Sequence, residues 1–448
     1  MEQNSKQFLK LIENLDAKIG IIGLGQVGLP TALSFSKVGF DVIGHDVNKK
    51  LLEQLENGTT PFEEEGLLDL LNSCRQKNKF FTESSFEKII QKCDVMIICV
   101  PTPLTDSIRP DLSALENVCN SLSEFSLKNK LVIIESSIPP GTFEELVLKS
   151  LNAKNCVGVD CWATFVPERL APGQALSEIL TTSRIIGYND EQSGNLARAL
   201  YSKMITGEIF VTPVRVAEIS KLVENTYRDV NIALANEVSI ICEMYGIDFK
   251  ELQRVCNTHP RVNLHNAGPG VGGPCLPKDS YLLLNPHGKK TIDSKIIQYA
   301  RKINDSMPQH VVDLVRKGLK SHNKSLSDSK IGIWGVSYKA NISDTRLSPA
   351  KEIIAKLKNE GAEVSVYDPK TNESFGGKRT SDMWDAISDN DALVVVKDHD
   401  EFKKADLSKI KENLRLPIIV DTRRIFDNKF VESLGISYLA IGYPSKTK

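Results

Sequence analysis

The chain has 448 residues, of which 41% are hydrophobic, and it carries 56 basic against 57 acidic side chains. A chain of this length exceeds the size at which one hydrophobic core keeps growing, so we expect two or three domains. The balanced charge, without a basic or acidic block, argues against a nucleic-acid groove or a polybasic membrane arm and favours small-molecule partners.

The amino-terminal stretch, Met1 to Asp16, carries charges throughout and lacks the apolar core of a signal peptide. The longest apolar runs, such as Val95–Val100, are far too short to span a membrane. The nine cysteines form no CxxC pair and show no metal-ligand spacing. We therefore expect a soluble, cytoplasmic protein with reduced, mostly buried cysteines and no metal site.

A β-α-β unit opens the first domain. Lys18–Ile22 and Phe40–Gly44 read as strands, with a helix over Leu29–Val38 between them. Strand-like segments follow at Val95–Val100 and Leu131–Glu135, separated by helical stretches. This order predicts an open, mainly parallel sheet with helices on both faces.

Three glycines follow the first strand in the pattern Gly23-x-Gly25-x-x-Gly28 and open the helix. Such a turn lets a pyrophosphate approach the helix N-terminus. Asp46 ends the second strand and is placed to accept a hydrogen bond from a ribose 2′-hydroxyl, which favours NAD over NADP. The alternative is a simple strand-to-helix turn, but strand, helix and acidic residue agree on a dinucleotide site.

A long helix connects the first domain to the rest. Thr212 and Pro213 suit the N-cap and first helical positions, and no Gly or Pro follows until Gly246. The helix carries an apolar stripe wide enough to join two domains or two subunits, formed by Ile219, Val223, Val230, Leu234, Val238 and Ile241.

Polar residues recur at three- and four-residue intervals along the same helix: Glu218, Lys221, Asn225 and Arg228. Their side chains share one face of the helix. This face is either a solvated stripe or, if the helix lies between domains, part of a site.

The segment Gly268–Asp279 packs glycines and prolines around one thiol, Cys275, and follows it with Lys278 and Asp279. A nearby ammonium favours the nucleophilic thiolate, and Asp279 could move a proton or orient a water. The alternative is a glycine-rich loop around a buried, inert cysteine.

The β-α-β pattern returns late in the chain, with a strand at Lys330–Gly335, a helix at Pro349–Asn359 and a strand at Glu363–Tyr367. Further strands are predicted at Leu393–Val396 and Pro417–Val420. We therefore expect an α/β protein with two doubly wound, Rossmann-like domains, residues 1–210 and 311–448, joined by a long-helix central domain, residues 211–310.

The loop after Gly335 lacks the glycine triplet and cannot hold a dinucleotide in the same way. Its Lys339 and Arg346 could instead neutralise a phosphate group, with Arg346 able to bind it through two hydrogen bonds. The alternative, to which we give equal weight, is a solvated loop with incidental charges.

Taken together, these motifs resemble the UDP-glucose/GDP-mannose dehydrogenase family from Lys18 to about Phe426. The glycine motif, the long helix and the cysteine loop match in order, as do four further segments: Val100–Pro103, Ser136–Thr142, Pro167–Arg169 and Ser343–Ala350. The resemblance implies an enzyme with an N-terminal NAD domain, a helical middle that forms much of a homodimer interface, and a C-terminal domain that binds the UDP part of a UDP-sugar.

The resemblance also implies residue roles. Cys275 matches the nucleophile, Lys221, Asn225 and Asp279 its polar neighbours, and Glu168 the acid/base of thioester hydrolysis, while Ser137 stands where the family more often has threonine. The expected NAD-binding residues are Gly23, Gly25, Gln26, Val27, Gly28, Asp46, Pro101, Thr102, Ser137 and Lys278. The expected substrate-binding residues are Glu168, Arg169, Lys221, Asn225, Arg228, Arg261, Gly272, Lys339 and Arg346.

Within the family, Pro167–Gly173, Asn225–Glu237 and Pro260–Asn263 look closest to the N-acetylhexosamine branch, which serves polysaccharide biosynthesis. We therefore favour UDP-N-acetyl-D-mannosamine, oxidised at C6 to the uronic acid. Pro274 and Lys278 depart from the pattern of many members of that branch, so UDP-N-acetylglucosamine is the close alternative, followed by UDP-glucose. A one-step hydroxyacid dehydrogenase and a non-catalytic NAD(H)-binding regulator are the rival classes.

Overall fold

A computed structural model describes residues 2–170 and 173–444 of the chain. These residues divide into two compact units. The first comprises the described residues up to Glu224 together with Tyr281–Asp293, and the second comprises Asn225–Ser280 together with the described residues from Ser294 onward. The three-domain division at residues 210 and 310 stays a prediction.

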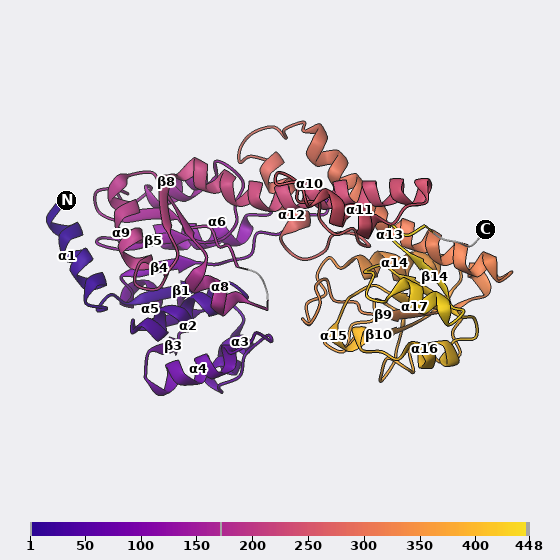
Figure 1. Ribbon diagram of the computed structural model, residues 1–448. Coiled ribbons are helices and arrows are strands. Elements are labelled where there is room, and N and C mark those ends of the chain that lie inside the picture. The colour runs from indigo at the N-terminus through magenta and orange to yellow at the C-terminus, as the bar shows by residue number, and fades with distance from the viewer. Residues whose placement is uncertain (1, 171–172, 445–448) are drawn as a thin grey trace. The chain divides into compact units, whose positions relative to one another are not determined.

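The first unit is built on a sheet in which eight described strands follow the order β3-β2-β1-β4-β5-β6-β7-β8 (Figure 1). All neighbours are parallel except β6 and β7. The strands are β1 (Ile19–Ile22), β2 (Val42–His45), β3 (Phe80–Thr82), β4 (Val95–Ile98), β5 (Leu131–Ile134), β6 (Trp162–Phe165), β7 (Arg184–Tyr188) and β8 (Ile209–Pro213).

Helices cover both faces of this sheet, as predicted. Successive residues of a strand point to opposite faces. Accordingly, Ile97 belongs to one buried apolar cluster and Ile98 to another. The helices of this unit are α1 (Glu2–Glu13), α2 (Gly28–Val38), α3 (Lys49–Glu56), α4 (Leu67–Gln76), α5 (Phe86–Lys92), α6 (Ser113–Ser123), a π-helix (Phe143–Leu148), α7 (Lys149–Leu151), α8 (Ala175–Thr181) and α9 (Glu191–Tyr201).

The second unit holds an all-parallel sheet whose described strands follow the order β11-β10-β9-β12-β13-β14 (Figure 1). The predicted repeat is thereby confirmed, and apolar clusters lie on both faces of the sheet. Its elements are β9 (Lys330–Trp334), β10 (Glu363–Tyr367), β11 (Lys378–Arg379), β12 (Ala392–Val395), β13 (Ile418–Asp421), β14 (Ser437–Ala440), α13 (Lys295–Ser321), a short 3-10 helix (Leu326–Asp328), α14 (Pro349–Asn359), α15 (Asp400–Lys403), α16 (Leu407–Asn413) and α17 (Asn428–Ser433).

The predicted long helix is α10 (Val214–Tyr245), which is followed by α11 (Phe249–Cys256) and α12 (Leu276–Leu284). It ends before Gly246, which has a φ of +70°, as a C-terminal stop requires. Its predicted start is wrong, because Thr212 and Pro213 complete the edge strand β8, paired with β7. A proline is tolerated on an edge strand, where its missing N–H costs few ladder bonds.

The two faces of α10 have an unusual burial pattern. The apolar stripe is open, with Val223 45% and Leu234 50% exposed. The polar face is closed: Glu218 is fully buried, and Lys221 and Asn225 are 5% and 2% exposed. The interpretation of Glu218, Lys221 and Asn225 as a solvated stripe is therefore wrong, whereas Arg228 is exposed.

Helix length and the state of the cysteines were two further expectations. Among the described residues, no helix combines the length and apolar character needed to cross a membrane. All nine cysteines are free thiols, and five of them, Cys74, Cys93, Cys119, Cys161 and Cys242, are buried, which agrees with the prediction.

Candidate active site

The glycine motif forms the turn between β1 and α2. A Cβ atom at Gly28 would overlap the carbonyl oxygen of Gly23, so only glycine fits at this position. A Cβ atom at Gly25, by contrast, would have no neighbour within 4 Å, and Gly25 is exposed. The turn is closed on the protein side and open on the other, next to the α2 N-terminus, which fits a dinucleotide pyrophosphate.

Asp46 lies directly after β2, next to this turn. Its Oδ2 accepts a hydrogen bond from the Leu24 N–H at 2.9 Å, and its Oδ1 accepts one from the Asn48 N–H at 2.8 Å. The backbone therefore fixes the carboxylate beside the glycine motif. This is the position that a ribose-binding acid occupies in a Rossmann domain.

The loops after β4 and β5 lie side by side at the same edge of the sheet. Thr102 donates its hydroxyl to the Ser137 carbonyl oxygen at 2.6 Å, and Thr102 is 4% exposed. Open α/β sheets bind ligands beyond the carboxyl ends of their strands, where these loops lie. The remaining predicted NAD ligands of this unit occupy accessible positions: Gln26 and Val27 are half-buried, and Pro101 is exposed.

Glu168 and Lys221 meet in the first unit. Glu168 follows β6 and is 7% exposed, and its Oε2 lies 3.9 Å from the Nζ of Lys221 on α10. A carboxylate and an ammonium in such a dry environment interact more strongly than in water. Such a pair can transfer a proton and can stabilise a charge that develops during a reaction. Pro172, in the same predicted motif, lies outside the described residues.

Arg169 is already engaged by protein groups. Its guanidinium binds Glu224 through Nε at 3.1 Å and Nη2 at 2.7 Å, and its Nη1 donates to the Ser183 carbonyl oxygen at 2.6 Å. These contacts hold the end of the Glu168 segment against α10. A direct contact with substrate stays a prediction.

Cys275 lies at the N-terminus of α12. Its carbonyl oxygen accepts hydrogen bonds from the N–H groups of Lys278 and Asp279, at 3.1 and 2.8 Å, and its side chain is partly exposed. The positive end of a helix dipole favours the thiolate form of a cysteine. An accessible thiol in this position has the features of a nucleophile rather than of a buried packing residue.

The glycines before Cys275 are required by close packing within the second unit. Gly273 has a φ of +90°, and a Cβ atom there would lie 2.7 Å from the ring of Tyr338. Its N–H donates to the Arg346 carbonyl oxygen at 3.0 Å, and a Cβ atom at Gly272 would lie 2.7 Å from the Leu347 carbonyl oxygen. The loop that carries the thiol therefore rests on the loop that carries Arg346.

Asn225 and Asp279 form a buried pair beside the thiol loop. Asn225 Nδ2 donates to Asp279 Oδ2 at 2.6 Å, and Asp279 is fully buried. Arg228 donates to the Oδ1 of Asn225, and Lys278 Nζ lies 3.8 Å from Asp279 Oδ1. Asn225 and Asp279, two of the three predicted polar neighbours of Cys275, thus contact each other, whereas the third, Lys221, contacts Glu168.

A buried polar chain, not predicted from the sequence, anchors the same loop. The Gly268 N–H donates to Asn236 Oδ1 at 2.8 Å, and Asn236 Nδ2 donates to Asn304 Oδ1 at 2.9 Å. Asn304 in turn donates to Asp229, which also binds Arg301 at 2.7 Å. Burial raises the pKa of Asp229, and Arg301 opposes that effect. The polar residues on α10 were the feature of the sequence from which this chain could have been predicted.

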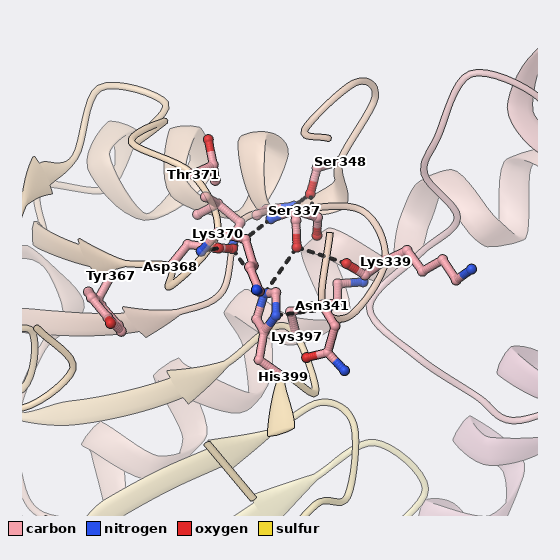
Figure 2. A network of polar contacts seen from close by, with 12 residues as sticks. Ser337, Lys339, Asn341, Ser348, Tyr367, Asp368, Lys370, Thr371, Lys397 and His399 are labelled. Carbon is pink, nitrogen blue, oxygen red and sulfur yellow. Dashed lines mark hydrogen bonds and ion pairs between the residues drawn. The ribbon is translucent and has the colours of Figure 1, made fainter. Parts of the chain in front are cut away.

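The loop after β9 carries two predicted phosphate ligands, Arg346 and Lys339, which lie in different environments. Arg346 is exposed but paired with Asp344, to which Nε donates at 3.0 Å and Nη2 at 2.6 Å. The Lys339 side chain points away from the polar cluster at the base of the loop (Figure 2). Arg261, another predicted ligand, is exposed. To bind a phosphate, the Arg346 guanidinium would have to release Asp344 or contact both Asp344 and the phosphate.

Two residues that approach the Gly268–Asp279 segment were not identified from the sequence. Tyr338 packs its ring against Gly273, and burial raises the pKa of its hydroxyl above the ordinary range. Arg423 approaches Gly268 and forms an ion pair with Asp398 at 3.3 Å. Both come from loops at the carboxyl ends of strands of the second sheet, so their strand-end positions were the signal.

Comparison with known proteins covers the chain almost from end to end. Models of the UDP-glucose/GDP-mannose dehydrogenase family match in three parts: its NAD binding domain over residues 17–205, its central domain over residues 215–306 and its UDP binding domain over residues 332–428.

Individual proteins agree with these matches. UDP-N-acetyl-D-mannosamine dehydrogenase of Methanococcus vannielii is 36% identical over 99% of both chains. The structure of UDP-D-ManNAc dehydrogenase from Pyrococcus horikoshii superposes with a TM-score of 0.88 at 36% identity and covers 95% of this chain and 99% of its own. NDP-N-acetyl-D-galactosaminuronic acid dehydrogenase of Ralstonia nicotianae is 32% identical over 92% of this chain and 96% of its own.

The glycine turn with Asp46, the accessible Cys275 and the three successive domain matches agree with one another. The chain is an NAD-dependent oxidoreductase, and it belongs to the UDP-glucose/GDP-mannose dehydrogenase family.

Proposed function

We propose that this enzyme oxidises the C6 hydroxyl of UDP-N-acetyl-D-mannosamine to the carboxylate, with Cys275 as covalent nucleophile. The observation that carries the proposal is the placement of Cys275: a partly exposed thiol at the α12 N-terminus, on a loop that rests against the loop of Arg346. A thiol can hold an aldehyde covalently on the enzyme until it is oxidised again.

The cofactor is held by the first unit. Gly23, Gly25 and Gly28 would receive its pyrophosphate and Asp46 its adenosine ribose, while Thr102 and Ser137, on the loops after β4 and β5, would contribute further contacts. NAD⁺ supplies the hydride acceptor, and an alcohol-to-acid oxidation uses two molecules of it for each sugar. The carboxylate of Asp46 would also repel a 2′-phosphate, which disfavours NADP⁺.

Cys275 acts between the two oxidations. Loss of one hydride and one proton turns the C6 alcohol into an aldehyde. The thiolate adds to the aldehyde carbon, and the oxygen takes a proton, giving a thiohemiacetal that holds the intermediate on the enzyme. Loss of the second hydride and that proton leaves a thioester. Water then adds to the thioester carbon and the thiolate leaves, so that Cys275 is regenerated.

The other residues manage protons and charge. Lys221 in its neutral form, or an ordered water, can take the alcohol proton. As an ammonium, Lys221, 3.9 Å from Glu168, can stabilise the tetrahedral oxyanions. Asn225, fixed by Asp279, provides a neutral amide donor for the same purpose. Glu168 acts as the base that activates the hydrolytic water.

The choice of sugar is supported by the similarity to relatives named for UDP-N-acetyl-D-mannosamine. UDP-N-acetylglucosamine and UDP-glucose are the alternatives, and the 32% identical Ralstonia relative is named for a galactosaminuronic acid. The test is a panel of the three UDP-sugars, UDP-N-acetyl-D-mannosamine, UDP-N-acetylglucosamine and UDP-glucose, with NAD⁺, followed by NADH absorbance and product identification. We expect the highest kcat/KM and two NADH per sugar with UDP-N-acetyl-D-mannosamine. One NADH per molecule would favour a one-step dehydrogenase, and none with any sugar would refute the proposal.

We further propose that the enzyme works as a cytoplasmic homodimer and supplies uronic acids for polysaccharide synthesis. Support for the dimer comes from the exposed stripe of α10, where Val223 and Leu234 are about half exposed. An apolar face of this kind marks an interaction surface. Leu234→Asp should shift the mass measured by light scattering toward the monomer, whereas Glu237→Ala, at an exposed position of the same helix, should not. A monomeric wild-type protein would contradict the assignment.

A further inference from the structure

His399 lies 1% exposed just after β12 and uses both of its ring nitrogens (Figure 2). The Asn341 N–H points at Nδ1 at 2.9 Å, and Nε2 lies 3.1 Å from both Asp368 Oδ2 and Ser337 Oγ. A backbone N–H can only donate, so Nδ1 is the acceptor and the ring proton sits on Nε2. The imidazole therefore connects Asp368 to the backbone of Asn341.

Asp368 is the second part of the arrangement. It follows β10, is fully buried, and accepts the N–H groups of Val336 and Ser337 at 2.7 and 3.0 Å. Burial tends to raise the pKa of Asp368, but the hydrogen bond from His399 and those from the two backbone N–H groups hold the pKa below its ordinary value. The carboxylate thus stays ionised and fixes the beginning of the loop, while His399 fixes its middle.

Lys397 completes the set. It is 2% exposed, and its Nζ donates to the Tyr338 carbonyl oxygen at 2.7 Å. Asp368, Lys397 and His399 are called the loop clamp below. They hold the backbone of residues 336–341 from the ends of β10 and β12, the strands on either side of β9. Lys339, which is half-buried, and the exposed Arg346 belong to the same loop.

We propose that His399 is a positioning residue for nucleotide-sugar binding: through Asn341 and Asp368 it keeps the loop of Lys339 and Arg346 in the conformation that receives the UDP group. The inference rests on the proposed function, in which that loop binds the UDP-sugar. Such a role explains why a histidine is buried here with both ring nitrogens hydrogen-bonded. For packing alone, a hydrophobic ring would suffice. The apolar contact is present too, because His399 packs edge-on against Phe402 with ring centroids 5.4 Å apart.

Three substitutions separate positioning from packing. His399→Phe keeps an aromatic ring beside Phe402 but removes both polar contacts. His399→Asn retains an acceptor near the position of Nδ1, and His399→Gln retains a donor near Nε2. His322→Phe is the matched control, because this histidine of the same unit contacts Ser437 at 2.9 Å and not the loop.

The experiment measures UDP binding by calorimetry, the KM values for UDP-sugar and NAD⁺, and hydrogen exchange of the peptide spanning residues 337–346. We expect His399→Phe to weaken UDP binding and raise the UDP-sugar KM at least tenfold, with faster exchange in this peptide. The KM for NAD⁺ should be unchanged. His399→Asn should restore slow exchange and most of the affinity, and the control should match wild type.

Two results would overturn the inference. One is unchanged UDP affinity in His399→Phe, whether or not the loop exchanges faster. The other is a larger loss of UDP affinity in His399→Asn and His399→Gln than in His399→Phe, which would indicate packing alone. The failure of the proposed function is a separate result. A wild-type protein that binds UDP but yields no NADH from any UDP-sugar would refute the proposed reaction, while the variants would still report on the clamp.

Discussion

Replacing Asn225 by aspartate tests the electrostatics of the site most sharply. Asn225 is 2% exposed, and its amide donates to the fully buried carboxylate of Asp279 at 2.6 Å. Asn225→Asp changes the shape very little but sets two carboxyl groups at hydrogen-bond distance. Like charges so close and so dry cannot both be ionised, so one member of the new pair must hold a proton.

The cost of this proton depends on pH. A carboxyl group in the unfolded chain has a pKa near 3.9, so keeping one protonated at pH 7 costs up to about 4 kcal/mol, at ~1.4 kcal/mol per pH unit. Because the pKa of the introduced carboxyl is raised by folding, its penalty is least near pH 4 and grows as the pH rises. Arg228, which donates to Asn225, offsets part of the cost.

The assay is urea unfolding of Asn225→Asp and wild type at pH 5, 6, 7 and 8. We expect the difference in unfolding free energy to widen with each step until the group ionises. Asn231→Asp is the matched control, because Asn231 is on the same helix and donates only to the Tyr227 carbonyl oxygen. A difference that does not change with pH would refute the reasoning, and with it the buried pairing of Asn225 and Asp279.

Three further predictions follow from other parts of the molecule. Asp46→Ala should narrow the preference for NAD⁺ over NADP⁺ in kcat/KM, and equal use of both by wild type would contradict the role of Asp46. Arg346→Ala should raise the UDP-sugar KM roughly ten- to a hundredfold, which corresponds to the loss of about 1.5–3 kcal/mol, with NAD⁺ binding unchanged. An unaltered KM would indicate that Arg346 belongs to a solvated loop and only pairs with Asp344. Asp368→Asn should destabilise the protein by about 2 kcal/mol above pH 4, with the loss shrinking as the pH falls toward 2, because a lowered pKa contributes stability only while the group is ionised. A constant loss in acid unfolding curves would argue against an ionised Asp368.

The sheets were largely predictable from the sequence, because buried parallel strands are continuous apolar runs. The helix over Pro349–Asn359 and the strand over Glu363–Tyr367 have the predicted bounds. The edge strands β3, β8, β11 and β14 and the inner strands β6 and β7 were missed. Short edge strands carry little apolar signal. The antiparallel step from β6 to β7 was also missed, because strand direction has no local signature.

The long helix shows where periodicity misleads. An apolar stripe normally marks the buried face of a helix. On α10 the stripe with Val223 and Leu234 is open, whereas Glu218 is buried because it accepts the N–H groups of Gly141 and Phe143, at 2.7 and 2.8 Å. Partners more than seventy residues away decide this burial, and the helix sequence alone does not reveal them.

The residues proposed for the chemistry were predictable from the sequence, whereas the residues that position the surrounding loops were less so. Cys275 and Asp46 stand out in the sequence because glycine patterns surround or precede them. The loop clamp does not stand out, because Lys397 and His399 follow an ordinary buried strand. Their role depends on the loop of a neighbouring strand, which only the folded sheet brings into contact.

The central claim is that Cys275 carries the intermediate, and one measurement tests it most directly: the NADH yield and product of Cys275→Ala with NAD⁺ and UDP-N-acetyl-D-mannosamine, with a hydroxylamine-type trap present. We expect the formation of the uronic acid to fall by several powers of ten, with a slow leak through the hydrated aldehyde. Residual turnover should stop at a trappable aldehyde after one NADH. Near-normal release of two NADH per sugar by Cys275→Ala would show that the thiol only packs its loop, and would contradict the covalent mechanism.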